Sequence, residues 1–197
     1  MNMNNAETWI IMGGATLVVL LGLATWRSYQ KRQSRRLKNR FGAEYDRTVI
    51  EMNGRNEGES NLKEREKRVE RFQIVPLEPA EADKFFLAWK TLQAGFIDNP
   101  AGVVIRADQL VRELMLKRGY PLGDFEHRAA DLSVDHSAVV QNYRAAHEIV
   151  ARVDRGEAST EEKRMAVVHL RTLFNELAVT AKIKSQIVRP AEMEMQP

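Results

Sequence analysis

The first apolar run of the chain extends from Trp9 to Trp26 and contains no charged residue. At 1.5 Å per residue, a helix of this length covers roughly 27 Å, close to the roughly 30 Å hydrocarbon core of a bilayer. A tryptophan at each end is typical of the membrane–water interface. The pattern predicts a transmembrane helix over residues 9–26, preceded by a short external N-terminus, residues 1–8.

Two other interpretations of this run are a cleaved signal peptide and a buried core helix. A signal peptide carries a basic region before its apolar run, whereas residues 1–8 contain only the acidic Glu7. Here the basic residues follow the run, as they do at the cytoplasmic end of a membrane helix. The sequence therefore favours an uncleaved single span with the N-terminus outside and the C-terminus in the cytoplasm.

Residues 27–60 are predicted to be a basic juxtamembrane segment that ends in a linker. Within them, apolar residues at helical spacing predict one short helix over residues 41–52. Residues 52–60 have glycines, asparagines and no apolar period, which is typical of a linker. The highly charged residues 61–72 place their few apolar side chains on one side, so a helix is predicted there, followed by an extended connector over residues 72–77.

Residues 61–181 are predicted to form an all-α cytoplasmic domain with about four main helices. Apolar positions recur there at steps of three and four, and no series of strands and turns is present. Asn99 before a proline and Ser159 three residues before a glutamate are helix start signals, and Gly156 is a stop signal. Residues 182–197 show no apolar period and are predicted to be a flexible tail.

Charge is distributed unevenly along the chain. The formal net charge is +3, but residues 27–40 contain seven basic residues and no acidic one, so the remainder sums to about −4. The basic character therefore belongs to the juxtamembrane segment, and nucleic acid is not expected as a partner. This segment could act only as a topology signal, or it could also contact anionic lipid headgroups. The candidate headgroup residues are Arg27, Lys31, Arg32, Arg35 and Arg36.

Residues with chemical potential are concentrated between Tyr120 and His147. Histidines 136 and 147, on one helix, would lie roughly 16 Å apart along its axis, too far to ligate one metal ion together. The chain has no cysteine, no GxSxG motif and no HExxH motif, so no catalytic residue, metal or cofactor is predicted. The candidate interaction or ligand site consists of Tyr120, Asp124, Asp131, Asp135, His136 and Tyr143.

These six residues are expected to converge on one side of the domain, with Asp131 or Asp135 accepting hydrogen bonds that fix the loop before them. The alternative role is architectural, because Asp124 and Asp135 both stand where a helix N-terminus needs an acceptor. A loop that interrupts regular helices can build a surface that smooth helices cannot, which is why this stretch is the best candidate for function.

The chain contains the segments RFGAEYDR from Arg40 and RGYPLGDFEHRAADLSVDHSAVVQNYRAAHEI from Arg118, of which the second is specific. These segments resemble an uncharacterised family of small bacterial single-pass membrane proteins. The first segment departs from the family pattern, in which a proline is expected in place of Ala43. The resemblance covers nearly all of the cytoplasmic part and implies a bacterial inner membrane protein. It implies no reaction, ligand or catalytic residue.

The favoured hypothesis is a non-enzymatic, membrane-anchored module that docks an unknown cytoplasmic protein or associates with itself. The alternatives are a small-ligand-binding or enzymatic domain that uses residues 120–147, and a module that binds anionic lipid. An exposed apolar groove on the helical domain would favour docking. A closed pocket that gathers Asp131, Asp135, His136 and Tyr143 would favour a ligand.

Overall fold

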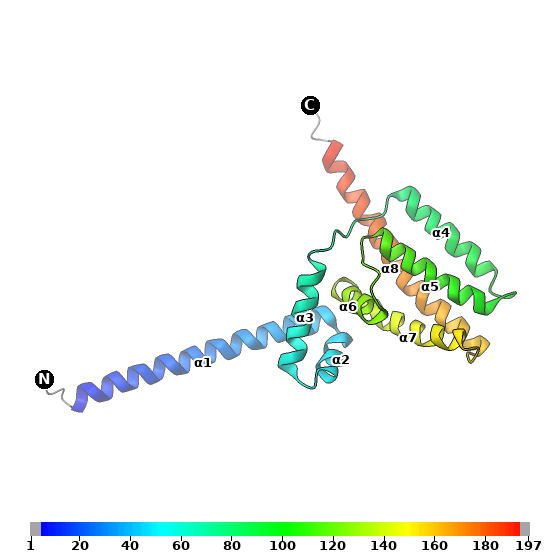
Figure 1. The fold of residues 1–197 in the computed structure, drawn as a ribbon. Coiled ribbons are helices and arrows are strands. Elements are labelled where there is room, and N and C mark those ends of the chain that lie inside the picture. The colour runs from blue at the N-terminus through cyan, green and yellow to red at the C-terminus, as the bar shows by residue number, and fades with distance from the viewer. Residues whose placement is uncertain (1–4, 194–197) are drawn as a thin grey trace.

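The computed structural model describes the backbone of residues 5–193 and the side chains of Leu17 and residues 20–179. Within this part the chain consists of helices and their connections, which confirms the predicted all-α class (Figure 1). The helices are α1 (Asn5–Phe41), α2 (Ala43–Glu51), α3 (Arg55–Val69), α4 (Pro79–Ala94), α5 (Pro100–Lys117), α6 (Phe125–Asp135), α7 (Ser137–Asp154) and α8 (Thr160–Met193).

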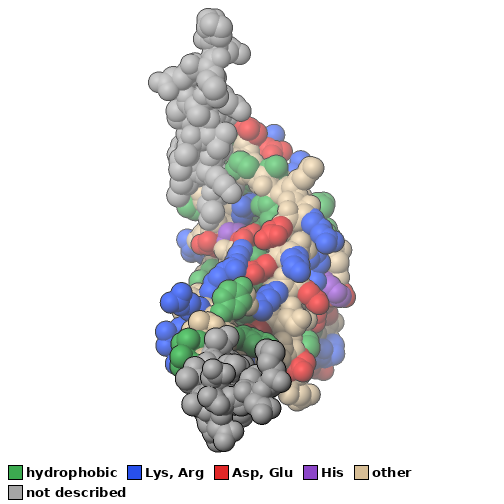
Figure 2. Space-filling view, turned by 90° about the vertical axis from the view of Figure 1, so that its left-hand side faces the viewer, with side chains coloured by type: hydrophobic (Ala, Val, Ile, Leu, Met, Phe, Trp, Pro, Cys, Tyr) green, Lys and Arg blue, Asp and Glu red, His purple; other side chains and the backbone are tan. Residues whose placement is uncertain are grey.

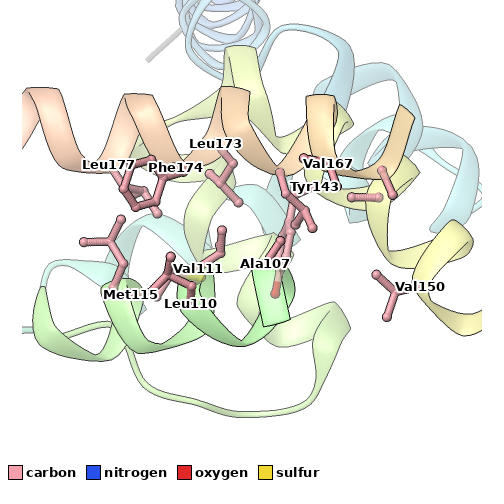
Figure 3. Close-up of a cluster of buried hydrophobic side chains, with 14 of the residues drawn as sticks. Ala107, Leu110, Val111, Met115, Tyr143, Val150, Val167, Leu173, Phe174 and Leu177 are labelled. Carbon is pink, nitrogen blue, oxygen red and sulfur yellow. The ribbon is translucent and has the colours of Figure 1, made fainter. Parts of the chain in front are cut away.

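Helices α4, α5, α7 and α8 surround the main hydrophobic core. Its side chains come from the apolar stripes that recur every three or four residues, because such a stripe forms one face of a helix. Figure 3 shows core side chains from α5, α7 and α8. Trp89 of α4 stacks on Phe174 of α8, with ring centroids 4.7 Å apart. Further buried members of the core are Leu110, Val111, Leu114, Met115, Val150, Leu170, Leu173 and Leu177.

The helix start and stop signals act as predicted. Asn99 caps α5 by accepting a hydrogen bond from the backbone amide of Gly102, with 2.9 Å between N and Oδ1. Before α8, Ser159 and Glu162 form a reciprocal capping box, in which each side chain accepts from the other residue's backbone amide. After α7 the chain reverses at Gly156, whose φ of 74° suits glycine.

A second hydrophobic cluster packs the C-terminal end of α1, together with α2 and α3, against α6. It consists of Leu37, Phe41, Tyr45, Leu62, Val69 and Val134, from α1, α2, α3 and α6. The C-terminal half of residues 27–60 therefore packs on the domain. The predicted boundary at residue 61 falls inside α3.

The prediction of a linker over residues 52–60 is wrong from Arg55 onward, because α3 begins there. Gly58, within the predicted linker, is instead a point of close contact between α3 and α2. A Cβ atom at this position would lie 2.9 Å from the Cα of Val49, so only glycine fits without a shift. The short helix predicted over residues 41–52 is confirmed as α2.

Helix α1 projects from the body of the molecule, and the end of α8 projects at another side (Figure 1). Among the described residues, no helix combines the length and the apolar character that crossing a bilayer requires. The predicted span, residues 9–26, falls largely on side chains outside the described ones. Helix α8 continues to Met193, so the backbone of residues 182–193 is helical where a flexible tail is predicted.

Candidate interaction site

The candidate site region begins with the N-terminus of α6. Asp124 caps this helix by accepting from the backbone amide of His127, with 2.9 Å between N and Oδ1. Its other oxygen lies 2.8 Å from His127 Nδ1, and these hydrogen bonds lower the pKa of the Asp124 carboxyl. Asp124 is exposed and acts as the predicted cap of α6.

His136 lies at the junction of α6 and α7, where it is the residue between the two helices. Its ring is buried, with Nδ1 3.1 Å from Glu176 Oε1 of α8 and Nε2 3.5 Å from Arg118 Nη1. Because a guanidinium can only donate, Nε2 must accept, and Nδ1 then carries the proton that is donated to Glu176. Burial lowers the pKa of His136, which favours this neutral form.

Tyr120 and Arg118 complete the buried surroundings of His136. The ring of Tyr120 lies 6.4 Å from that of His136, and Arg118 Nη1 donates to the backbone carbonyl of Leu177 on α8 at 3.3 Å. Burial raises the pKa of the Tyr120 hydroxyl and lowers that of Arg118. The group therefore ties the end of α5 to the α6–α7 junction and to α8.

Asp131 and Asp135 face the basic residues of α1 and α3. Arg68 donates to Asp131 through Nε at 2.7 Å, and the aspartate is buried. Arg40 lies 3.6 Å from Asp135 and donates from Nε to the backbone carbonyl of Val134 at 3.1 Å. The predicted helix-capping role of Asp135 is wrong, since Asp135 ends α6 and His136 precedes α7.

Tyr143 occupies a different environment. It is buried in the main core, its ring packs on Phe125 with centroids 5.0 Å apart, and Arg128 donates to its hydroxyl at 3.1 Å. Burial raises the pKa of Tyr143. Both partners belong to the first turn of α6, the end opposite to Asp135.

The six residues therefore do not converge on one surface. Tyr120, His136 and Asp135 gather at the C-terminal end of α6, whereas Asp124 and Tyr143 belong to its N-terminal end, roughly 15 Å away along an eleven-residue helix. Asp131 accepts a hydrogen bond from Arg68 of α3. The expectation that Asp131 or Asp135 accepts hydrogen bonds that fix the loop is not met, because the donor to Asp131 is the side chain of Arg68 on α3.

The sequence shows no sign of a buried ionic network that joins α2, α3 and α7. Glu44 of α2 accepts from Arg144 of α7 at 3.0 and 3.2 Å and from Gln141 at 2.9 Å, and Arg65 of α3 lies 3.6 Å away. Arg144 also donates to Glu126 at 2.7 Å. These residues are far apart in sequence, so no local spacing could have indicated them.

An open apolar groove of about 770 Å³ lies between α4 and α5. Its walls include Leu92 and Val103, and Leu87 at its edge is 66% exposed. Ile97, in the turn beside the groove, is 90% exposed. None of the six predicted site residues contributes to this groove.

The basic residues of α1 divide into two groups. Arg27, Lys31, Arg32 and Arg35 are exposed and have no ion-pair partner among the described residues. By contrast, Arg36 and Arg40 bind Glu66 of α3 at 3.2 and 2.8 Å, and Lys38 binds Asp46 at 3.0 Å. Arg36 is thus already engaged by the domain. Figure 2 shows lysine and arginine side chains, with acidic ones among them, on the face from which α1 projects.

No protein-family model, no curated protein and no solved structure matches this chain. In the described part of the chain, no group of three or more histidine and acidic side chains is placed to hold a metal ion. The function must therefore be inferred from the surfaces and clusters themselves.

Proposed function

We propose that this protein is a membrane-anchored, non-enzymatic interaction module whose helical domain docks a cytoplasmic protein through the α4–α5 groove. The observation that carries the proposal is the groove itself, flanked by Leu87 and Ile97, two large apolar side chains left mostly in water. Exposed apolar surface of this kind is typical of protein-binding sites.

The shape of the groove favours a helix as its occupant. Two antiparallel helices form its walls, and an amphipathic helix can place its apolar face between them. Lys84 and Arg106 line the groove, and Asp98 lines its end at the α4–α5 turn. A partner helix with acidic residues near Lys84 and a basic residue near Asp98 would match these charges.

The proposed membrane anchor is the uncharged run of residues 9–26. The resemblance to bacterial single-pass proteins supports the bacterial inner membrane as its location. Because Leu37, Phe41 and the Glu44–Arg144 pair attach α1 and α2 to the domain, the groove would be held at a fixed position relative to the anchor. Such a fixed position suits a module that presents a partner near the membrane.

The docking test is a crosslinking pull-down from membranes with the tagged full-length chain. Leu87→Glu should abolish recovery of a partner that the unmodified chain retains, because it places a charge in the apolar contact. Leu116→Glu is a matched control, since Leu116 is also exposed but does not line the groove. Equal recovery with both variants would reject the groove, and recovery of only the chain itself would indicate self-association.

Topology is tested separately with reporter fusions after Pro197. Activity of a reporter that works only in the cytoplasm, and resistance of the protein to carbonate extraction, are the expected results. Periplasmic activity would reject the proposed orientation, and release by carbonate would reject the span.

A second candidate function, contact with anionic lipid, is favoured by one observation. Arg27, Lys31, Arg32 and Arg35 follow the proposed span directly and are exposed without ion-pair partners in the part of the chain that is described. Each basic residue near an anionic surface contributes on the order of 1 kcal/mol to binding.

A further inference from the structure

A polar cleft of about 340 Å³ lies between α1 and α3. Helix α3 crosses the C-terminal part of α1 (Figure 1), and the two are held together there by Leu37, Leu62 and the Arg36–Glu66 ion pair. The α1 residues that line the cleft run from Trp26 to Ser34. The cleft is therefore on the side of the crossing that faces the proposed membrane span.

Hydrogen-bond donors dominate the α3 wall of this cleft. Arg55, Asn56, Ser60 and Lys63 all line it, whereas Glu59 is its single acidic residue. The Glu59 carboxylate is already used, since Oε1 accepts from Tyr45 Oη at 2.8 Å and from Arg55 Nε at 2.9 Å. Burial acts to raise the pKa of Glu59, but hydrogen bonding to Ser34, Arg55 and Tyr45 favours the charged carboxylate and lowers this pKa.

Lys63 is the cation that remains available in the cleft. It has no ion pair or hydrogen bond to the described residues, and it lines both this cleft and the adjoining hollow that contains Lys67. Arg55, in contrast, is held by Glu59 and by the hydroxyl of Ser34. The cleft therefore contains one positioned guanidinium and one free ammonium.

The α1 wall adds two aromatic rings. Trp26 and Tyr29 line the cleft and are 63% and 62% exposed, so they are not part of a protein core. Tryptophan and tyrosine are enriched at headgroup depth in membranes, where one end of the ring is apolar and the other is wet. With residues 9–26 in the bilayer, Trp26 marks the interface and the cleft opens at the level of lipid headgroups.

The exposed polar face of α3 extends this arrangement. Asn56, Ser60, Lys63 and Lys67 are spaced by four, three and four residues, so they lie on one face of the helix. These residues line the two hollows against α1, together with the acidic residues Glu59, Glu66 and Glu70. Two lysines and two neutral donors thus form a row beside the point where α1 would enter the membrane.

We propose that the cleft binds the phosphodiester of an anionic phospholipid. Lys63 and Arg55 would bind the phosphate oxygens, Asn56 and Ser60 would donate hydrogen bonds to it, and Trp26 and Tyr29 would contact the glycerol region. This inference rests on the proposed membrane anchor, and it adds a defined headgroup site to the general attraction of Arg27, Lys31, Arg32 and Arg35.

The test uses the full-length chain in micelles of a neutral detergent. It is titrated with dihexanoyl phosphatidylglycerol, dihexanoyl phosphatidylcholine or inorganic phosphate while intrinsic tryptophan fluorescence is recorded. Phosphatidylglycerol should give a saturable change through Trp26, and phosphatidylcholine and phosphate should bind at least about tenfold more weakly, since they lack the net charge or the glycerol contacts.

Lys63→Gln should weaken phosphatidylglycerol binding about fivefold, and Lys63→Arg should retain most of it. Lys67→Gln is the matched control, because it removes the same charge from the same helix face outside this cleft. Each variant is expected to keep the helical circular dichroism spectrum and thermal midpoint of the unmodified chain, since neither lysine has an ion-pair partner among the described side chains.

Equal weakening by Lys63→Gln and Lys67→Gln would reduce the site to unspecific charge attraction and overturn the proposal. Binding of inorganic phosphate as tight as that of phosphatidylglycerol would reject lipid as the source of the phosphate. Leu87→Glu should leave the titration unchanged. A lost titration with retained carbonate resistance and partner recovery would reject only the cleft, whereas release from membranes by carbonate would reject the anchor.

Discussion

Glu44 and Arg144 form a bidentate ion pair across the contact of α2 with α7, a hundred residues apart in the chain, and their exposed fractions are 1% and 5%. The pair is the charged centre of the attachment between the α1–α3 segment and the helical domain. Arg65 lies beside it, and burial lowers the pKa of this second arginine. Removal of Glu44 would leave the buried Arg65 guanidinium without its carboxylate and would leave Arg144 with Glu126 alone.

The first prediction is that Glu44→Ala lowers the free energy of unfolding by about 3–5 kcal/mol, because breaking a buried ion pair leaves an uncompensated charge. Urea denaturation followed by circular dichroism measures the change. Glu51→Ala is the control, since its partner Arg47 is on the same helix and both are partly exposed. A similar small loss for both variants would show that the Glu44–Arg144 pair does not stabilise the attachment.

The second prediction concerns Trp89. Trp89→Ala should lower the free energy of unfolding by about 3–5 kcal/mol, because it empties a large volume in the main core and removes the stacking on Phe174. Leu87→Ala, two residues away on the exposed side of α4, should change it by less than about 0.5 kcal/mol. Comparable losses for the two would contradict the orientation of α4 on the core.

The sequence predicted those parts of the fold that depend on neighbours along the chain. The cap at Asn99, the Ser159–Glu162 box and the stop at Gly156 all use contacts within about four residues, so their spacing is visible in the sequence. The stripe that contains Trp89 is visible for the same reason. The presence of these helices can therefore be predicted without knowledge of tertiary contacts.

What could not be predicted depends on contacts between distant segments. The sequence predicts a linker at Gly58, because glycine is unfavourable inside a helix. Only the close approach of Val49 in the tertiary structure explains why α3 contains this glycine. Asp131 and Asp135 are expected to serve the adjacent loop, but their partners, Arg68 and Arg40, lie on α3 and α1, far away in the sequence. Local spacing carries no information on such pairs.

The third prediction is a pH dependence that His136 causes. Because its pKa in the folded state is lowered, chiefly by burial, the unfolded chain binds more protons at pH values between that lowered pKa and about 6.5. Stability is therefore complete above about pH 6.5 and falls as the pH decreases through this window. The surrounding charged groups are Arg118, Glu176 and Asp135, and a proton on Nε2 would face the Arg118 guanidinium.

Thermal unfolding between pH 5 and pH 7.5 measures this effect. His136→Gln should flatten the profile, because a neutral side chain replaces the titrating ring. The pKa of His147 is also lowered by burial, so His147→Gln is the matched control and should remove a separate part of the slope. An unchanged slope in His136→Gln would show that this ring does not limit stability in mild acid.

The last prediction separates the two groups of basic residues on α1. Arg40 donates to Glu66 at 2.8 Å and to the carbonyl of Val134, and it lies near Asp135, so it joins α1 to α3 and α6. Arg40→Ala should therefore lower the free energy of unfolding by about 1–3 kcal/mol, because the buried Glu66 carboxylate and the Val134 carbonyl lose a charged donor. Arg32→Ala should change it by less than about 0.5 kcal/mol, since Arg32 is exposed and has no ion-pair partner among the described residues.

Binding of the two variants to lipid should show the opposite order. A peptide of residues 27–41 that carries Arg32→Ala should bind vesicles of mixed phosphatidylglycerol and phosphatidylcholine more weakly by about fivefold, the equivalent of about 1 kcal/mol for one basic residue. In the folded chain, lipid contact should depend on Arg32 and not on Arg40, whose guanidinium is bound by Glu66. Denaturation compares the stability of the two variants, and vesicle sedimentation compares their binding to lipid. If Arg32→Ala destabilised the fold as much as Arg40→Ala, the division of the basic segment into a domain-binding group and a lipid-facing group would be wrong.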